Sequence, residues 1–481
     1  MSKIKKQYFF KELVFLITIL FFFSCKKAAK NESAQPAGQL SVNVPSVNFT
    51  ADGGSQDITI TSNTDWTLYN PASSWLQTSV TSGKSGSTIV HITTISQNTT
   101  GATLSGLLEI NPSNGQGTKL IVTQLSTIYP TYNTSPIAPD MTGMTNTAVQ
   151  QASYMKLGIN LGNTLEAPGG ETGWGSPVIT ENIIKFMQQS GFNSIRLPCS
   201  WDYTHIINKG TEQIDPAWLA RVKQVVGYCV NNNMYVILNI HWDGGWLVCT
   251  PDKQDSVNAK QKALWEQIAT AMRDFDGHLM FASENEPTTN DAGQMAILES
   301  YHQTFVNAVR STGGHNAYRI LVVQGASQLM NAFPADPAPN RMMFEEHNYT
   351  PWQFTEMIGD QSWGNMFYYW GTGHHSTIEP SRNATWGEES DMNTYFQGIK
   401  QKFVDKGIPV IMGEYAAIRR SEPLDQVAHQ ASVDYWITFN TKQALANGLK
   451  PFYWDTGGVL NRQNLTVNDQ RTLNAIIAGG K

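Results

Sequence analysis

The sequence predicts a multidomain protein in which a small β-sandwich is followed by a (β/α)8 TIM barrel. Between residues 39 and 128 the chain is rich in Ser, Thr, Asn and Gly and carries short runs of alternating polar and apolar residues. After about residue 145, amphipathic helical segments alternate with short apolar strands. The first pattern is typical of antiparallel β-structure, and the second indicates repeated strand–helix units.

The composition is that of a folded protein and excludes two broad classes. Of 481 residues, 41% are hydrophobic and 11% aromatic, including 14 Trp, which argues against a chain that is mainly disordered. Lys and Arg number 33 against 39 Asp and Glu, for a net charge of −6. We expect no nucleic-acid partner, because that would require a basic surface.

Residues 1–24 are predicted to be a signal peptide. Lys3, Lys5 and Lys6 precede an apolar run from Leu13 to Phe23 that only Thr18 interrupts, too short to span a bilayer of about 30 Å. Ser24-Cys25 follows at once, and a cysteine at this place resembles the lipobox of bacterial lipoproteins; an ordinary signal peptide with a chance cysteine is the alternative.

The lipobox resemblance implies that Cys25 is lipidated and that residues 25–38 are a flexible tether. The protein would then be an outer-membrane lipoprotein of a bacterium, on the cell surface or the periplasmic face. Residues 26–30 are basic, whereas surface-exported lipoproteins of gut bacteria usually carry acidic residues there, so the membrane face stays open.

The remaining cysteines predict neither a disulfide framework nor a metal site. Cys199, Cys229 and Cys249 lack CxxC spacing, and at most one disulfide could form among them. We expect no metal and no cofactor, and a monomeric chain.

Four alternating runs predict the strands of the sandwich over residues 39–128. They are 57–60, 88–92, 106–110 and 119–124. Trp66 and Trp75 are expected to fill its core. The set Asp65-Trp66, Trp75-Leu76, Gly86, Asn98 and Val122-Thr123-Gln124 resembles the BACON domain, a small immunoglobulin-like module whose name implies carbohydrate binding. No row of exposed aromatics is evident, so we favour a spacer over a sugar-binding module.

Three prolines mark residues 129–144 as a stiff linker to a catalytic domain over residues 145–481. Eight candidate strands follow, centred on Asn160, Arg196, Asn239, Phe281, Leu321, Phe344, Ile411 and Tyr453. Amphipathic segments such as 216–231 and 259–275 lie between them. Eight strand–helix units predict a barrel whose chemistry lies at the carboxyl ends of its strands.

Two carboxylates follow the fourth and seventh predicted strands. Glu286 stands in Asn285-Glu286-Pro287, and Glu414 in Gly413-Glu414-Tyr415. A pair of carboxyl groups about 5–5.5 Å apart hydrolyses a glycosidic bond with retention, one as general acid and the other as nucleophile. Different surroundings at the barrel mouth would give them the different pKa values that these roles need.

These motifs resemble glycoside hydrolase family 5, and six further positions of that family are present. They are Arg196, His241, Asn285, His347, Tyr349 and Trp454. The resemblance implies that Glu286 is the acid/base and Glu414 the nucleophile. It also implies that Arg196 and Tyr349 support Glu414 and that His347 sets the protonation of Glu286. His241 and Asn285 would contact sugar hydroxyls, and Trp454 would stack under the sugar at the cleavage point.

The segments 160–166 and 171–175 resemble the fourth subfamily of family 5, which places Asn163 at the substrate site. This resemblance implies an endo-β-1,4-glucanase acting on cellulose, xyloglucan or mixed-linkage β-glucan. Asp243 and Ala282 depart from the common pattern, so a mannanase or glucomannanase stays an alternative. A second alternative is a non-catalytic glycan-binding lipoprotein, but the intact Glu286 and Glu414 argue against it.

A long loop after the sixth predicted strand is rich in aromatic residues. Among them are Trp352, Trp363, Phe367, Tyr368, Tyr369, Trp370 and Trp386. Because aromatic faces suit pyranose rings, we expect an open cleft and a β-linked polysaccharide partner. About half of these rings are expected to pack the loop on the barrel instead. Trp363 is the preferred substrate contact, with Trp242 and Trp246 as lesser candidates.

Overall fold

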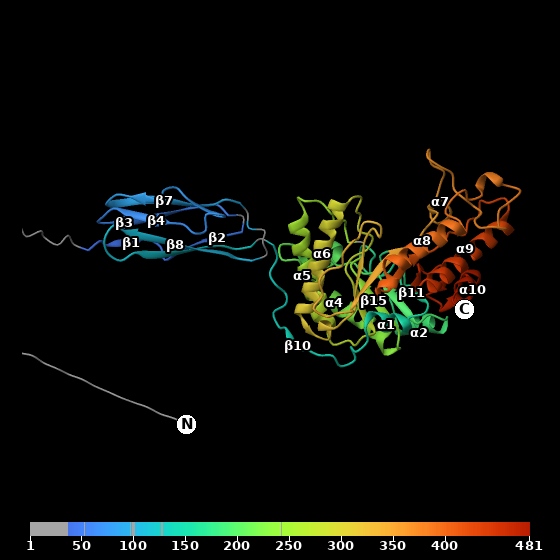
Figure 1. The fold of residues 1–481 in the computed structure, drawn as a ribbon. Helices are drawn as coiled ribbons and strands as arrows, with labels where there is room; N and C mark the ends of the chain where they lie inside the picture. Colours follow the sequence, from blue (N-terminus) through green and yellow to red (C-terminus); the bar gives the residue numbers. More distant parts are fainter. Residues whose placement is uncertain (1–36, 52, 97, 99–101, 127, 242) are drawn as a thin grey trace, which may run out of the picture. The chain divides into compact units, whose positions relative to one another are not determined.

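The computed structural model describes residues 37–481 except 52, 97, 99–101, 127 and 242. The predicted signal peptide, Cys25 and Trp242 therefore lie outside the described residues. The chain divides into two compact units, one with most of the N-terminal strands and one with the barrel (Figure 1). No helix in the described part of the chain is long and apolar enough to cross a membrane.

The N-terminal strands form two sheets, as expected for a separate β domain. Their orders are β1-β3-β7-β5 and β2-β9-β8-β4-β6. Every second residue is buried along much of β7 and β8, so each sheet turns one face inward, as in a sandwich. The strands are β1 (Leu40–Val42), β2 (Ser46–Phe49), β3 (Ser55–Ser62), β4 (Trp66–Tyr69), β5 (Leu76–Thr78), β6 (Ser82–Gly83), β7 (Gly86–Thr94), β8 (Leu104–Pro112) and β9 (Thr118–Gln124).

The two tryptophans of this unit differ in burial. Trp66 lies in the core, as predicted, whereas Trp75 is only partly buried because it sits in the turn before β5. Tyr69 is 62% exposed and is the one strongly exposed aromatic ring among the described residues of this unit. A single exposed ring does not form the row of aromatics that a sugar-binding surface would need. The role of this unit as a spacer stays a prediction.

Eight parallel strands close into a barrel, which confirms the predicted (β/α)8 fold. Every predicted strand centre falls within one of them. In barrel order they are β11 (Gly158–Asn160), β12 (Ser194–Leu197), β15 (Tyr235–Asn239), β16 (Leu279–Ala282), β18 (Leu321–Gln324), β19 (Met342–His347), β20 (Val410–Tyr415) and β21 (Leu449–Tyr453). Most of their residues are buried, because the barrel interior is packed and helices cover its outside.

The main helices follow the strands as the periodicity predicts, with one exception. They are α2 (Glu181–Gln189), α4 (Pro216–Asn231), α5 (Gln254–Met272), α6 (Ala292–Ser311), α8 (Glu389–Lys402), α9 (Gln426–Ala446) and α10 (Gln470–Gly479). Helices α5 and α6 lie side by side, as do α9 and α10 (Figure 1). Residues 325–341, all described, contain no helix, so the expectation of eight complete strand–helix units is wrong after β18. Three prolines in this short connection disfavour a helix there.

One end of the barrel is closed by helix α1 (Ala148–Tyr154). The Thr147 side chain caps its first turn, and Ala148 and Ala152 join a buried cluster with Ile237 and Met280. This cluster fills the end at which the strands begin. The carboxyl ends of the strands are left as the mouth of the barrel.

Part of the predicted linker lies against the barrel. Thr131, Tyr132 and Asn133 all donate hydrogen bonds to Oε2 of Glu266 on α5, at 3.0, 2.6 and 3.2 Å. Strand β10 (Ile137–Pro139) pairs with β17 (Gly313–Gly314). The limits of the signal, tether, sandwich, linker and catalytic segments stay predictions.

Candidate active site

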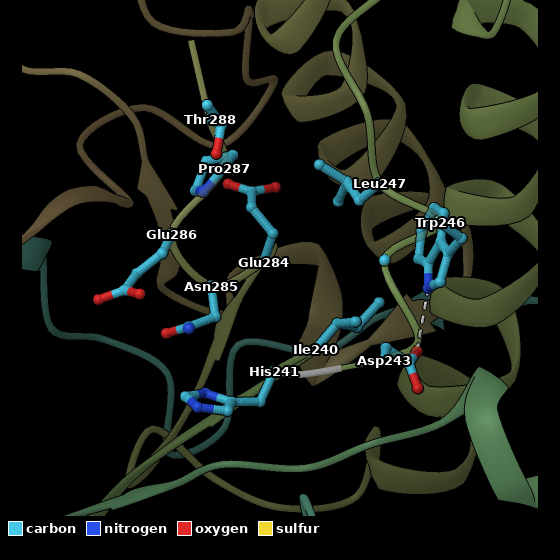
Figure 2. A pocket seen from close by; sticks show the side chains of 11 residues that line it. Ile240, His241, Asp243, Trp246, Leu247, Glu284, Asn285, Glu286, Pro287 and Thr288 are labelled. Carbon is cyan, nitrogen blue, oxygen red and sulfur yellow. Dashed lines mark hydrogen bonds between the residues drawn. The ribbon is translucent and has the colours of Figure 1, made fainter.

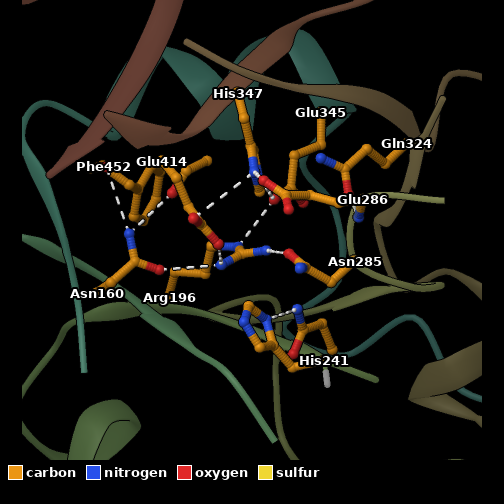
Figure 3. Close-up of polar contacts among 12 residues, drawn as sticks. Asn160, Arg196, His241, Asn285, Glu286, Gln324, Glu345, His347, Glu414 and Phe452 are labelled. Carbon is orange, nitrogen blue, oxygen red and sulfur yellow. Dashed lines mark hydrogen bonds and ion pairs between the residues drawn. The ribbon is translucent and has the colours of Figure 1, made fainter. Parts of the chain in front are cut away.

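The predicted site residues meet at the carboxyl ends of the barrel strands, although they are far apart in the sequence. Arg196, His347 and Glu414 belong to strands, and the others follow a strand within a few residues. Figure 3 shows the polar contacts around Arg196, Glu286, His347 and Glu414. The residues placed here are Arg196, His241, Asn285, Glu286, His347, Tyr349, Glu414 and Trp454.

Arg196 is the centre of this network and is fully buried in β12. Its Nε lies 2.8 Å from Glu345, and its Nη1 donates to Glu414 at 2.7 Å and to Asn160 at 3.1 Å. Its Nη2 donates to Asn285 Oδ1 at 2.6 Å. Burial alone would lower the pKa of Arg196, but the two carboxylates outweigh it and raise that pKa. The charged guanidinium therefore fixes the positions of four side chains.

Glu414 is held on both carboxylate oxygens. Oε1 accepts from Arg196, and Oε2 accepts from the hydroxyl of Tyr349 at 3.0 Å. Burial and the nearby Glu414 hold the pKa of Tyr349 well above its usual range, so the hydroxyl keeps the proton that it donates. With its side chain only 7% exposed, Glu414 is an immobile carboxylate that both donors stabilise.

Glu286 is presented very differently. It follows β16 on a loop, with a backbone φ of +47°, in the left-handed region that non-glycine residues seldom adopt. Gln324 holds this turn, because its Oε1 accepts the Glu286 backbone N–H at 2.7 Å. The side chain is 54% exposed and receives a 2.8 Å contact from His347 Nδ1. That hydrogen bond, against the opposing effect of burial, lowers the pKa of Glu286.

His347 lies between three carboxylates. Its Nδ1 is 2.8 Å from Glu286 and 3.7 Å from Glu414, and its Nε2 is 2.9 Å from Glu345. Burial alone would lower its pKa, but the three acidic groups raise the pKa of His347 to about 9. Below that pH the ring is an imidazolium that donates from both nitrogens.

The side chains beside this network are oriented by their own hydrogen bonds. The side-chain oxygen of Asn285 accepts a hydrogen bond from Arg196, so the amide nitrogen Nδ2 of Asn285 is the group that can donate to a sugar. Asn239 Nδ2 lies 3.2 Å from His241 Nδ1, and Asn239 Oδ1 is taken by a backbone N–H. Burial and the Arg196 charge keep the pKa of His241 well below its usual range, so the ring is neutral and carries its proton on Nε2. His241 stacks with Trp454 at a centroid distance of 5.7 Å.

Asn163 and Trp363 lie outside this network. Asn163 adopts a φ of +59°, and its backbone N–H donates to the buried Glu166, which fixes the loop after β11. Trp363 is 63% exposed, and its ring centroid lies 5.9 Å from that of Trp352. The Trp352 side chain hydrogen-bonds Glu356, a residue whose pKa is raised by burial and by Glu286 and Glu414. Trp363 thus belongs to a surface pair beside the carboxylates.

The aromatic loop divides as expected. Phe367, Tyr368, Tyr369 and Trp370 are buried against the barrel, whereas Trp352, Trp363 and Trp386 are between 44% and 63% exposed. Helix α7 (Trp352–Thr355) carries the first of these exposed rings. The three buried cysteines form no disulfide among the described residues.

Sequence reasoning missed three residues of the network: Glu345, Gln324 and Asn160. Glu345 is fully buried between Arg196 and His347, and Arg196 and His347 lower its pKa against the effect of burial. A Cβ at Gly413 would lie 2.1 Å from Glu345 Oε1, so this glycine leaves the space for the carboxylate. The only signal was the acidic pair Glu345-Glu346 after the apolar start of the strand, directly before His347.

Glu286, His347 and Glu414 also approach closely enough to raise the question of a metal ion. One ligand atom of each lies within 4.8 Å of the other two. The three side chains already pair with one another, and the neighbouring carboxylates raise the pKa of His347. The cluster is therefore suited to proton transfer between His347 and Glu286.

Comparison with known proteins decides the family. Residues 159–458 match the family described as Cellulase (glycosyl hydrolase family 5). The chain belongs to glycosyl hydrolase family 5. It is a glycoside hydrolase that acts as a retaining endo-β-1,4-glycanase.

Relatives of this family 5 chain cover most of its length. It is 31% identical over 477 residues to a xyloglucan-specific endo-β-1,4-glucanase of Bacteroides ovatus, covering 93% of this chain and 91% of the relative. The structure of a Bacteroides ovatus family 5 xyloglucanase with a XXXG heptasaccharide is similar, with a TM-score of 0.68 and 30% identity over 92% of this chain and all of that one. A third similar protein is a xyloglucan-specific β-1,4-glucanase from a ruminal metagenomic library, solved in complex with XXLG. Its structure has a TM-score of 0.63 and 39% sequence identity, and the match covers 70% of this chain and 96% of that one.

Proposed function

We propose that this chain cleaves the β-1,4-glucan backbone of plant cell-wall polysaccharide, with Glu414 as nucleophile and Glu286 as acid/base. The observation that carries the proposal is the spacing of the two carboxylates. One carboxylate oxygen of each and one ring nitrogen of His347 all lie within 4.8 Å of one another. A separation of this order is that of retaining enzymes, whereas the carboxyl groups of inverting enzymes stand about 6.5–9.5 Å apart.

Each carboxylate has surroundings that suit its role. Glu414 attacks the anomeric carbon, and Arg196 and Tyr349 hold it in one orientation as a carboxylate. Glu286 gives a proton to the leaving oxygen and later takes one from water. The His347 imidazolium lies beside Glu286, and these two side chains share the proton that is transferred. Because the side chain of Glu286 is exposed, it can reach both the leaving group and a water molecule.

The neighbouring side chains bind the sugar at the cleavage point. Asn285 Nδ2 and His241 Nε2 are both donors, and they meet hydroxyl oxygens of the ring. Trp454 offers its face below the sugar. Asn163 supports this site through the loop after β11. The Trp352–Trp363 pair contacts sugar units of the polysaccharide that lie farther from the cleavage point.

Two of the solved relatives support xyloglucan as a substrate, whereas other relatives are named endoglucanases of broad specificity. One is titled a xyloglucanase in complex with a XXXG heptasaccharide and the other a xyloglucan-specific β-1,4-glucanase in complex with XXLG. Product analysis on carboxymethyl-cellulose, xyloglucan, mixed-linkage glucan, glucomannan and xylan tests this directly. We expect the highest kcat/KM on xyloglucan or another β-glucan; preferred cleavage of glucomannan would favour the mannanase alternative.

The retaining mechanism has its own test. A 2-deoxy-2-fluoro glucoside or oligoglucoside with a good leaving group should label the enzyme covalently, and peptide mass spectrometry should place the label on Glu414. An NMR time course should show the β-anomer first. Label on another residue, or first formation of the α-anomer, contradicts the assignment.

We also propose that Cys25 anchors the chain by lipid in a bacterial outer membrane, with residues 39–128 as a BACON-like spacer and the chain as a monomer. The support is the position of Cys25 one residue after the end of the apolar run at Phe23. In cells, a Cys25→Ser variant should lose labelling by a fatty-acid probe and leave the membrane fraction. Protease access in intact cells distinguishes the surface from the periplasmic face.

A further inference from the structure

The turn that presents Glu286 begins directly after β16 and comprises residues 283–286. It ends in the left-handed φ of +47° at Glu286, and such a conformation persists only where the surroundings hold it. A general acid must lie within hydrogen-bond reach of the oxygen that it protonates, so a small displacement of this turn would slow the reaction. The contacts that fix the turn are therefore part of how the acid works.

Glu284, in the middle of this turn, is buried and turned away from the catalytic carboxylate. Figure 2 shows the side chains of Glu284 and Glu286 pointing in different directions. Glu284 Oε1 accepts hydrogen bonds from the hydroxyl of Ser283 and from His302 Nε2, the latter at 2.8 Å. It also accepts the backbone N–H of Gln324 at 3.3 Å. No described residue donates to Oε2, so a single oxygen makes all these contacts.

His302 anchors Glu284 to the middle of helix α6. Its side chain is fully buried, and its Nε2 carries the proton, because the carboxylate oxygen that faces it accepts. Gln324 lies at the end of β18. Through one oxygen, Glu284 thus joins the helix to the neighbouring barrel strand.

Gln324 carries this connection on to the acid. Its backbone N–H donates to Glu284, while its side-chain Oε1 accepts the backbone N–H of Glu286 at 2.7 Å. Because both contacts belong to one residue, a shift of Gln324 would also shift the acid. A continuous series of hydrogen bonds therefore runs from His302 to the backbone of Glu286.

We infer that the buried pair Glu284–His302 positions the acid/base, because through Gln324 it holds the turn that directs Glu286 at the leaving oxygen. This inference rests on the proposed function. Both members of the pair are positioning residues and act without touching the sugar. Their loss should therefore slow the step that needs the acid and spare a reaction that does not.

The test compares two substitutions of Glu284 on two kinds of substrate. Glu284→Leu removes the acceptor, whereas Glu284→Gln keeps an oxygen that can accept from both His302 and Gln324. We expect kcat/KM on β-glucan to fall roughly three- to twelvefold in Glu284→Leu, the effect of one lost hydrogen bond, and to stay within about twofold in Glu284→Gln. An aryl β-cellotrioside with an acidic phenol leaves without protonation, so its kcat/KM should stay within about twofold in both variants. Equal losses on the two substrates, or no loss on either, would overturn the inference.

A double variant tests the route through Gln324. If Glu284 acts through Gln324, then Glu284→Leu combined with Gln324→Leu should lose no more activity on β-glucan than the more damaged single variant. Independent effects would multiply instead. Losses that multiply would mean that Glu284 does not act on the acid through this residue.

Tyr301→Phe is the matched control. Tyr301 precedes His302 on α6, is equally buried and donates one hydrogen bond, to the carbonyl of Val248 in the loop after β15, at 2.9 Å. Its loss should lower the melting temperature without any difference between the two substrates. The same difference between substrates in Tyr301→Phe would mean a general effect of weakening α6 and would overturn the role of the pair.

Two further measurements keep the result decisive. If Glu284→Leu does not fold, His302→Leu removes the same contact from the helix side and should show the same dependence on the substrate; its absence would overturn the inference. Covalent labelling of Glu414 in the wild type does not depend on this pair. Failure of that labelling would count against the proposed mechanism and not against the positioning of Glu286.

Discussion

The ends of β16 and β20 carry the same residue type in opposite surroundings. Glu414 lies within its strand, is 7% exposed and has a donor on each oxygen. Glu286 lies on a loop with a left-handed backbone, its side chain is 54% exposed, and its carboxylate pairs with His347. The difference shows how one fold gives two glutamates different roles: two donors hold one in a fixed orientation, while exposure and the neighbouring imidazolium let the other exchange protons.

Replacing Glu414 should produce the largest effect. Glu414→Gln keeps the shape but removes the nucleophile, so we expect kcat to fall by at least about four orders of magnitude on every substrate, whatever its leaving group. Reducing-sugar release from β-glucan, together with affinity electrophoresis in the same polymer, checks this result. Glu299→Gln on the outer helix α6 is the matched control. Turnover close to that of the wild type would remove Glu414 from the mechanism.

Replacing Glu286 should cost less, and the loss should depend on the leaving group. Glu286→Ala is expected to lower kcat/KM on polysaccharide by about 10²–10⁴-fold, the usual contribution of a general acid. An aryl glycoside with an acidic phenol leaves without protonation, so its first step should be nearly unaffected. Azide needs no general base and should restore turnover as a β-glycosyl azide. Equal losses on all substrates, without azide rescue, would contradict the difference between the two glutamates.

Removing His347 should shift the pH profile. The raised pKa keeps a proton on the His347–Glu286 pair below about pH 9, and the proton is lost as the pH rises through that value. The alkaline limb of kcat/KM should therefore lie near 9 in the wild type and move to lower pH in His347→Asn, where a lone carboxyl must hold the proton. His91→Asn in the sandwich should leave the profile unchanged. An alkaline limb at the same pH in His347→Asn would separate this histidine from acid catalysis.

Changing Gln324 should have the smallest effect. Gln324→Leu removes the acceptor of the Glu286 backbone N–H, a loss of about 0.5–1.5 kcal/mol, or roughly 2–12-fold in rate. Because the change acts through the acid, kcat on polysaccharide should fall while an activated aryl glycoside is spared. Gln303→Leu on α6 is the control. A change in melting temperature without this substrate dependence would make Gln324 a purely structural residue.

The sequence alone predicted the barrel because apolar runs at regular spacing have few other solutions. It also placed Arg196, Glu286 and Glu414 at strand ends, where parallel strands bring distant residues together. It failed after β18, where the connection of residues 325–341 contains three prolines and no helix. It also missed Glu345 and Gln324, because a polar residue at the end of a strand does not reveal which distant side chain it pairs with.

What the sequence determined, then, is the fold class and the residue types at the barrel mouth, since both follow from local periodicity and motif. Only the tertiary structure decided which glutamate is rigid and which is exposed. Hydrogen bonds across the barrel, such as Arg196 to Glu414, set that difference, and so does the left-handed turn at Glu286. Burial and pairing depend on residues far apart in the chain, and no local pattern contains them.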